Sequence, residues 1–228
     1  MAYMLSRTTW LMASALTFLT PHVQALELDG IHLANATQVS GHPLVLNGAG
    51  ISKRWFFNVY AMGLYLPDRR DHRTVLDGNA ARRMQITLMR PISGSEFEEA
   101  IASRLSRYAE KAGQAQISAQ MNLVVKAIAR QPNGLRKGDV LTLDWIPGTG
   151  TRIELNGSPL LSPLSGTVFY NALLRIWLGD DPADPDLKPK LLGKLRLPPN
   201  DPCQIATGDA DCSAGKVLMA ADARQRDW

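Results

Sequence analysis

The sequence predicts an α+β fold in which helices pack on one face of an antiparallel sheet. Segments rich in β-branched and aromatic residues come first, followed by two amphipathic helices, a β-hairpin and a last helix. This order favours an α+β domain, because α/β folds alternate strand and helix throughout. The chain has 228 residues, 45% of them hydrophobic, which is enough apolar mass for a sizeable core.

The first 25 residues are expected to be a secretory signal peptide. Arg7 supplies the positive charge ahead of a mostly apolar stretch of ten residues at 10–19, and small side chains at Val23 and Ala25 fit a cleavage site. The stretch is too short to span about 30 Å of hydrocarbon, although an uncleaved anchor remains the alternative. We therefore expect a periplasmic or secreted protein with no transmembrane segment after signal removal.

Composition narrows the classes of function. The formal net charge is +4, but the basic residues are scattered, so a nucleic-acid groove is not expected. The four histidines are dispersed and there are only two cysteines, so neither a metal site nor a cofactor is predicted. In an oxidising compartment, Cys203 and Cys212 would form a disulfide. They lie in a polar tail, 198–228, which follows a single domain at 26–197.

A turn and a short strand are expected at 39–46, ahead of Asn47-Gly48-Ala49-Gly50. Residues 51–66 (ISKRWFFNVYAMGLYL) then predict one long strand, because they contain many β-branched and aromatic residues and no proline. Both faces of this strand would mix rings with polar groups, so one is expected to pack on helices and the other to line a hollow. Alternation places Ser52, Arg54, Phe56, Asn58 and Tyr60 on one face.

The remaining elements follow from periodicity and end signals. Ser93 and Glu96 form a capping-box pattern before a helix that would run to about residue 112. Its apolar positions include Phe97 and Ile101, with Arg104 or Leu105 next in the same spacing. The other expected elements are a strand at 82–90, a helix at 117–130, a hairpin of strands 140–146 and 152–155, a helix at 167–178 with Val168 and Trp177 inside, and a helical turn at 188–192.

Four blocks, taken together, resemble the chalcone-isomerase-like family, and its secreted bacterial branch in particular. They are NGAGI at 47–51, VYAMGLYL at 59–66, PISG at 91–94 and ALLRIWLG at 172–179, in the family's order. The resemblance implies an open-faced β-sandwich, with a large antiparallel sheet, helices on one face and a ligand cleft between the two. The plant members are isomerases that close a flavanone ring, and another branch binds fatty acids through an arginine and a tyrosine.

The family's functional positions are changed here. The family arginine aligns with Ser52, which cannot replace a fixed cation, although Arg54 would reach the same space. Tyr60 aligns with the tyrosine of the fatty-acid binders, while Phe97 replaces the isomerases' catalytic tyrosine and has no hydroxyl. The helix asparagine aligns near Arg104. None of the four isomerase positions keeps its residue, so the resemblance supports the fold better than chalcone chemistry.

We therefore expect noncatalytic binding of a small amphiphile, such as a fatty acid or an aromatic acid, in a cleft between sheet and helices. An intramolecular lyase acting on an enone and a noncatalytic envelope module remain alternatives. For Tyr60 and Arg54 the structural alternatives are ring packing and a solvated sheet edge. The expected ligand-binding residues are Ser52, Arg54, Asn58, Tyr60 and Phe97.

Overall fold

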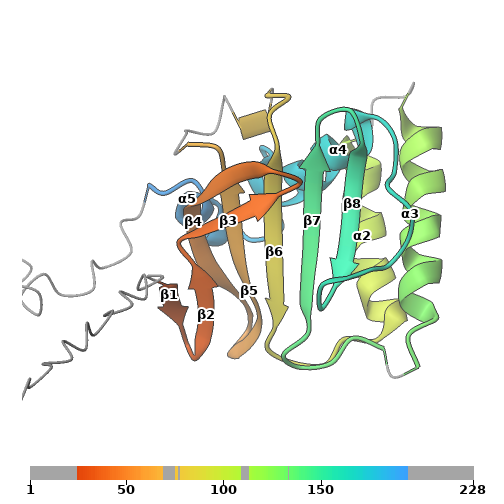
Figure 1. Ribbon diagram of the computed structural model, residues 1–228. Helices are drawn as coiled ribbons and strands as arrows, with labels where there is room; N and C mark the ends of the chain where they lie inside the picture. The colour runs from red at the N-terminus through yellow and green to blue at the C-terminus, as the bar shows by residue number, and fades with distance from the viewer. Residues whose placement is uncertain (1–24, 69–74, 77, 109–112, 133, 195–228) are drawn as a thin grey trace, which may run out of the picture.

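The computed structural model describes residues 25–68, 75–76, 78–108, 113–132 and 134–194. Their main feature is a seven-stranded antiparallel sheet in the order β3-β4-β5-β6-β7-β8-β9, beside a two-stranded sheet of β1 and β2 (Figure 1). The strands run His42–Arg54 (β4), Phe57–Leu66 (β5), Arg82–Leu88 (β6), Val140–Ile146 (β7) and Gly150–Leu155 (β8), with shorter strands at Ala25–Leu28 (β1), Ile31–Ala34 (β2), Ala36–Val39 (β3) and Ser158–Pro159 (β9).

The helices form two groups, one inserted between two strands of this meander and one after its last strand. Helices Gly94–Tyr108 (α2) and Gln114–Ala129 (α3) connect β6 to its neighbour β7, and helices Thr167–Leu178 (α4) and Leu187–Leu191 (α5) follow β9. In Figure 1 helices α2, α4 and α5 lie behind the sheet, and α3 stands beside them past the β8 edge. The α+β class with helices on one face of an antiparallel sheet is confirmed. None of the described helices is long and apolar enough to cross a membrane.

Alternation along the strands creates two cores of unequal size. The larger core lies between the sheet and the helices, where Met84, Ile86 and Leu88 of β6 pack with Leu173 and Ile176 of α4. The smaller one lies on the other face, where the buried side chains are Leu33, Val39, Leu44, Leu46, Ala49, Tyr65, Ala81 and Ile146. Strands β5 and β7 contribute to both cores, because successive side chains of a strand point to opposite faces.

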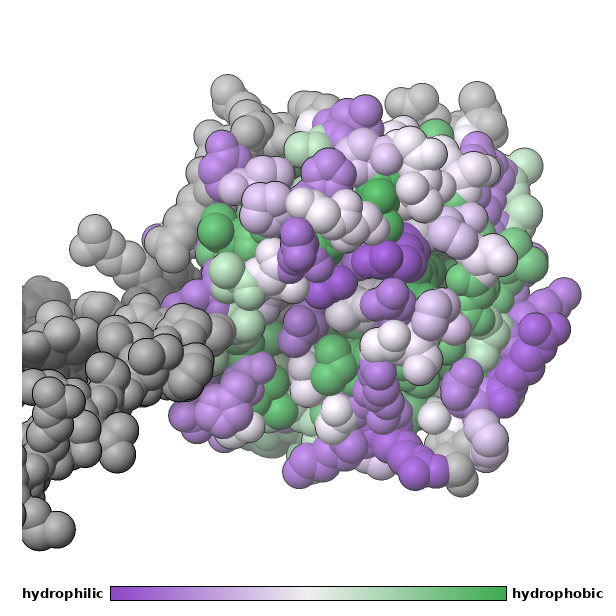
Figure 2. All heavy atoms as spheres, viewed as in Figure 1, coloured by the Kyte–Doolittle hydropathy of each residue, from purple (hydrophilic) through white to green (hydrophobic). Residues whose placement is uncertain are grey.

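The sheet is curled, so that its β3 end passes over the face opposite the helices (Figure 1). Arg83 of β6 donates to Thr37 of β3 at 3.1 Å, and Arg152 of β8 donates to Ser40 at 3.3 Å. Both arginines also bind the fully buried carboxylate of Asp144, at 2.7 and 2.9 Å. These ion pairs fasten the overlap, and Figure 2 shows hydrophilic residues among hydrophobic ones over this face.

The prediction of one strand at 51–66 was wrong. The chain turns back at Trp55 and Phe56, and β4 and β5 pair as an antiparallel hairpin with Arg54 opposite Phe57. The hairpin moves Phe56 out of the expected inward face and into the turn, where its side chain is exposed. It brings Ser52 and Tyr60 together for a different reason from the one predicted, since they are partners on neighbouring strands.

Other elements match their predictions closely. The capping box at the start of α2 is confirmed, because the Ser93 N–H donates to Glu96 at 2.9 Å and the Glu96 N–H donates to the Ser93 hydroxyl at 3.1 Å. Helix α4 and strand β7 have the predicted bounds. Val168 was predicted inside but is one of the exposed large hydrophobic residues. The predicted tail at 198–228, the predicted Cys203–Cys212 disulfide and all of the predicted signal peptide 1–25 except Ala25 lie outside the described residues.

Helix α5 is seated directly on β4, which fixes the last described element against the first long strand. The Asn47 side-chain amide donates to the Leu191 carbonyl at 2.7 Å. A Cβ atom at Gly48 would lie 2.1 Å from the Lys190 carbonyl oxygen, so this close approach requires glycine.

Replacing Gly48 with alanine is expected to push α5 away from β4 and to destabilise the fold by roughly 1–3 kcal/mol, the usual cost of overpacking. Urea unfolding of the purified protein measures this change. The matched control is Gly94→Ala, because a Cβ there meets only an atom at 3.9 Å at the start of α2. Equal stability of the two variants would show that the α5 contact is dispensable.

Candidate functional site

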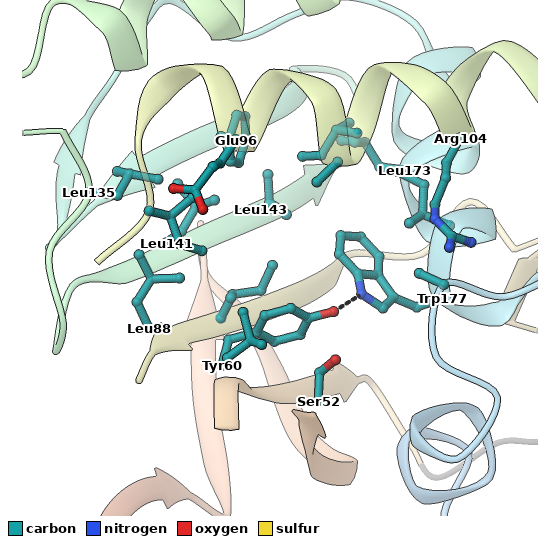
Figure 3. A pocket seen from close by; sticks show the side chains of 18 of the residues that line it. Ser52, Tyr60, Leu88, Glu96, Arg104, Leu135, Leu141, Leu143, Leu173 and Trp177 are labelled. Carbon is teal, nitrogen blue, oxygen red and sulfur yellow. Dashed lines mark hydrogen bonds between the residues drawn. The ribbon is translucent and has the colours of Figure 1, made fainter. Parts of the chain in front are cut away.

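A cavity of about 370 Å³ lies between the helix-facing side of the sheet and helices α2, α3 and α4 (Figure 3). Its volume is at the lower end of the range found for small-molecule sites. Both layers contribute side chains to its wall, so the cavity belongs to the main core rather than to a surface loop.

Most of the wall is apolar. Branched aliphatic side chains cover much of the sheet side and of the helix side. They include Ile86 and Leu88 of β6, Leu141 and Leu143 of β7, Ile153 of β8, Ile101 of α2, Val124 of α3 and Leu173 of α4. A wall of this kind suits a hydrocarbon or an aromatic ring.

One end of the cavity is polar. Ser52 of β4 and Tyr60 of β5 are paired across the hairpin, and Trp177 of α4 reaches them from the helix layer. The Trp177 indole N–H donates to the Tyr60 hydroxyl at 2.8 Å (Figure 3). The Ser52 hydroxyl also hydrogen-bonds to the Tyr60 hydroxyl. Because an indole nitrogen only donates, the Tyr60 oxygen accepts the hydrogen bond from Trp177. The Tyr60 O–H can therefore donate a hydrogen bond to a molecule in the cavity.

Burial raises the pKa of Tyr60 above its ordinary value, an effect that the charge of Asp184 reinforces. Hydrogen bonds from Ser52 and Trp177 and the nearby charge of Arg104 act in the opposite direction and are outweighed. The phenol is therefore neutral at physiological pH and can donate a hydrogen bond without bringing a negative charge into the cavity.

Cationic side chains outnumber carboxylates around the cavity. Lys53, Arg54, Arg90 and Arg104 line it, against Glu96 and Glu99. Arg90 is paired with Glu96 at 3.3 Å. Figure 3 shows Arg104 at the end that holds Trp177 and the Tyr60 hydroxyl, with Glu96 at the other end. The polar end thus combines a half-buried cation with a neutral donor, which suits an anionic or strongly dipolar head group.

Four of the five predicted ligand-binding residues line the cavity, namely Ser52, Arg54, Tyr60 and Phe97. The fifth, Asn58, does not, and its side-chain amide donates to Asp29 in the β1–β2 turn. A bulge accounts for this difference, because the pairing passes from Ser52–Tyr60 to Lys53–Asn58 and leaves Val59 of β5 without a partner. The extra residue breaks the alternation between Asn58 and Tyr60 that the prediction assumed.

Sequence reasoning missed two residues of the polar end, Arg104 and Trp177. Arg104 follows Phe97 and Ile101 at helical spacing, and an arginine within an apolar stripe was a usable sign that this face meets something polar. Trp177 was read as ordinary core, and its apolar neighbours in the sequence gave no other signal. Among the described residues, no group of three or more His, Cys, Asp or Glu side chains could hold a metal ion.

The titration of Tyr60 tests this geometry. Its phenolate absorbance is expected to appear above pH 10.0, its ordinary pKa, because burial disfavours the charged form. The difference between the titration curves of wild type and Tyr60→Phe isolates this tyrosine from the other four. An ordinary pKa of Tyr60 would mean that its hydroxyl is in bulk water.

The same shift has a defined effect on folding stability. Burial raises the pKa of Tyr60 and also that of Tyr65, the latter to about 12. The folded state therefore keeps both phenol protons to higher pH than the unfolded chain does. Their contribution is fully present below pH 10.0 and is lost as the pH rises from there toward the folded values. Urea midpoints measured across this range should fall less steeply in Tyr65→Phe.

Comparison with known proteins completes the description of the site. The family model for chalcone isomerase-like proteins matches residues 25–193. A solved structure of a fatty-acid binding protein from Arabidopsis thaliana is similar in fold, with a TM-score of 0.56 and 13% sequence identity over 75% of this chain and 97% of that one. No curated protein sequence matches the chain. With its family model covering most of the chain, this protein belongs to the chalcone isomerase-like family.

Proposed function

We propose that this protein binds a small amphiphile, a fatty acid or an acid with an aromatic body, without transforming it. The observation that carries the proposal is that one cavity combines a mostly apolar wall with a polar end formed by Tyr60, Trp177 and Arg104, whereas the charged pair at its other end, Arg90 and Glu96, is mutually neutralised. Such a combination matches a molecule with one polar head and one apolar tail.

The head group would be a carboxylate. Tyr60 offers its neutral phenol proton, and Arg104 offers a guanidinium whose charge already acts on that phenol. A hydrogen bond from a cation to a carboxylate is shorter and stronger than one between neutral groups. The excess of cations over carboxylates around the cavity favours an anion in the same way.

The tail would supply most of the affinity. Each methylene removed from water contributes about 0.8 kcal/mol, so affinity should rise roughly fourfold per methylene until the cavity is full. Two polar anchors then suffice for selectivity between head groups. The similarity in fold to a fatty-acid binding protein supports this reading of the cavity.

We propose further that binding takes place in the periplasm or outside the cell. The proposal rests on the charged, apolar and small-residue pattern of residues 1–25, with the mature chain beginning near β1. N-terminal sequencing of the protein recovered from its producing cell tests it, since an unprocessed Met1 would contradict removal of the signal.

The proposal does not extend to turnover of an enone. The position of the family's arginine is occupied by Ser52, and Phe97, which lines the cavity, offers no hydroxyl to polarise a ketone. Arg104 lies on a helix across the cavity from that position, so its presence favours an anionic head group rather than the isomerase arrangement.

Affinity for matched fatty acids and fatty alcohols tests the proposal. Arg104→Gln is expected to weaken binding of the acid roughly tenfold to a hundredfold, the usual worth of a charge-assisted hydrogen bond. Binding of the alcohol of equal length should fall far less. Titration calorimetry or displacement of a fluorescent fatty acid measures both.

The matched control is Arg136→Gln, which removes the same charge from an exposed position outside the cavity wall. It should leave both affinities unchanged. If wild-type protein takes up neither acids nor alcohols, or if its affinity does not depend on chain length, the proposed function is wrong.

A further inference from the structure

The tip of the β4–β5 hairpin exposes three consecutive aromatic side chains. Trp55 is 88% exposed, Phe56 95% and Phe57 71%. The other exposed large hydrophobic residues among those described, Leu123 and Val168, are single residues on two different helices. An apolar cluster at the end of a protruding turn marks an interaction site, because nothing in the folded domain shields it from water.

The backbone at this tip disfavours a bulky residue. Trp55 has a φ of 59°, in the left-handed region that two-residue hairpin turns usually fill with glycine or asparagine. A tryptophan there strains the backbone, and its exposed ring gains little packing in compensation. The requirements of folding therefore do not explain the aromatic side chain at this position.

Two cationic residues immediately precede the three aromatic residues in the chain. Lys53 and Arg54 are exposed at the end of β4, next to the turn. Aromatic rings next to basic side chains in the chain match the interface of an anionic bilayer, where the rings enter the headgroup layer and the cations meet phosphate. Lys53 and Arg54 also line the cavity, so the cavity reaches the surface beside this tip.

We propose that the Trp55–Phe57 tip docks on an anionic lipid surface and that the cavity exchanges its amphiphile with that surface. The exchange rests on the proposed function, whereas the docking does not. The size of the tip favours a membrane over a protein partner or a second copy. Three aromatic side chains bury roughly 450–750 Å², less than the 800 Å² or so that each partner of a standard protein interface contributes.

Co-sedimentation with vesicles tests the docking. Wild-type protein should bind phosphatidylcholine vesicles that contain phosphatidylglycerol more tightly than vesicles of phosphatidylcholine alone. The double variant Trp55→Asn with Phe56→Ser should lose at least tenfold in partition coefficient, because burial of two rings is removed. Asparagine tolerates the left-handed backbone, so the hairpin should remain folded. Any binding through the apolar N-terminal residues cancels in this comparison, since both chains carry them.

Two further variants separate the contributions. Lys53→Gln with Arg54→Gln should reduce the preference for anionic vesicles about fivefold per charge removed. Leu123→Ser, the matched control for an exposed apolar residue elsewhere, should leave vesicle binding unchanged. Equal partitioning of wild type and the tip variant would overturn the docking, as would a dimer in gel filtration that the tip variant abolishes.

Fatty-acid uptake then distinguishes this inference from the proposed function. The tip variant should take up a fluorescent fatty acid from solution with unchanged affinity, since Trp55 and Phe56 do not line the cavity. Its uptake from anionic donor vesicles should be slower than that of wild type. Equal rates would overturn the exchange, while a wild type that docks but binds no fatty acid would refute the proposed function and leave the docking in place.

Discussion

The reversal of the chain at Trp55 and Phe56 is the constraint on which the site depends. It sets the register that pairs Ser52 with Tyr60, and thereby fixes where the polar end of the cavity lies. Next to this pair the register shifts, because Val59 of β5 has no partner between Ser52–Tyr60 and Lys53–Asn58, and both Lys53 and Arg54 line the cavity. The same short turn thus positions a neutral donor inside the core, cations at its edge and aromatic rings beyond it. A longer or shorter loop would separate these three features.

The sheet can enclose a cavity on one side because its other side is closed independently. The curl that carries β3 over β6–β8 buries a second core and the ion pairs of Asp144 with Arg83 and Arg152. Burying such charges is costly, and the pairing chiefly prevents an unpaired charge in the interior. Contacts on that opposite face keep the sheet curled, so the packing of helices against the sheet is not needed for its shape. Helices α2, α3 and α4 can therefore surround a space of about 370 Å³.

Local signals were sufficient for most of the fold. Strand β7, helix α4 and the Ser93–Glu96 capping box follow from alternation, helical spacing and end signals that act within a few residues. The hairpin was missed because its turn contains no glycine, proline or asparagine, and a left-handed tryptophan leaves no mark in the sequence. Tyr60 and Ser52 were identified through family resemblance, whereas the contact of Trp177 with Tyr60 joins positions 117 apart and has no local signature.

The seat of α5 on β4 also has a consequence for the order of events during synthesis. Asn47 and Leu191 are 144 positions apart, so β4 acquires this partner only when nearly the whole domain has left the ribosome. Until then the face of β4 at Gly48 lacks the α5 backbone that covers it in the folded domain. A nascent chain of this protein therefore spends most of its translation time with this part of the sheet face uncovered, and a chaperone that shields exposed faces of incomplete domains would have its greatest value there.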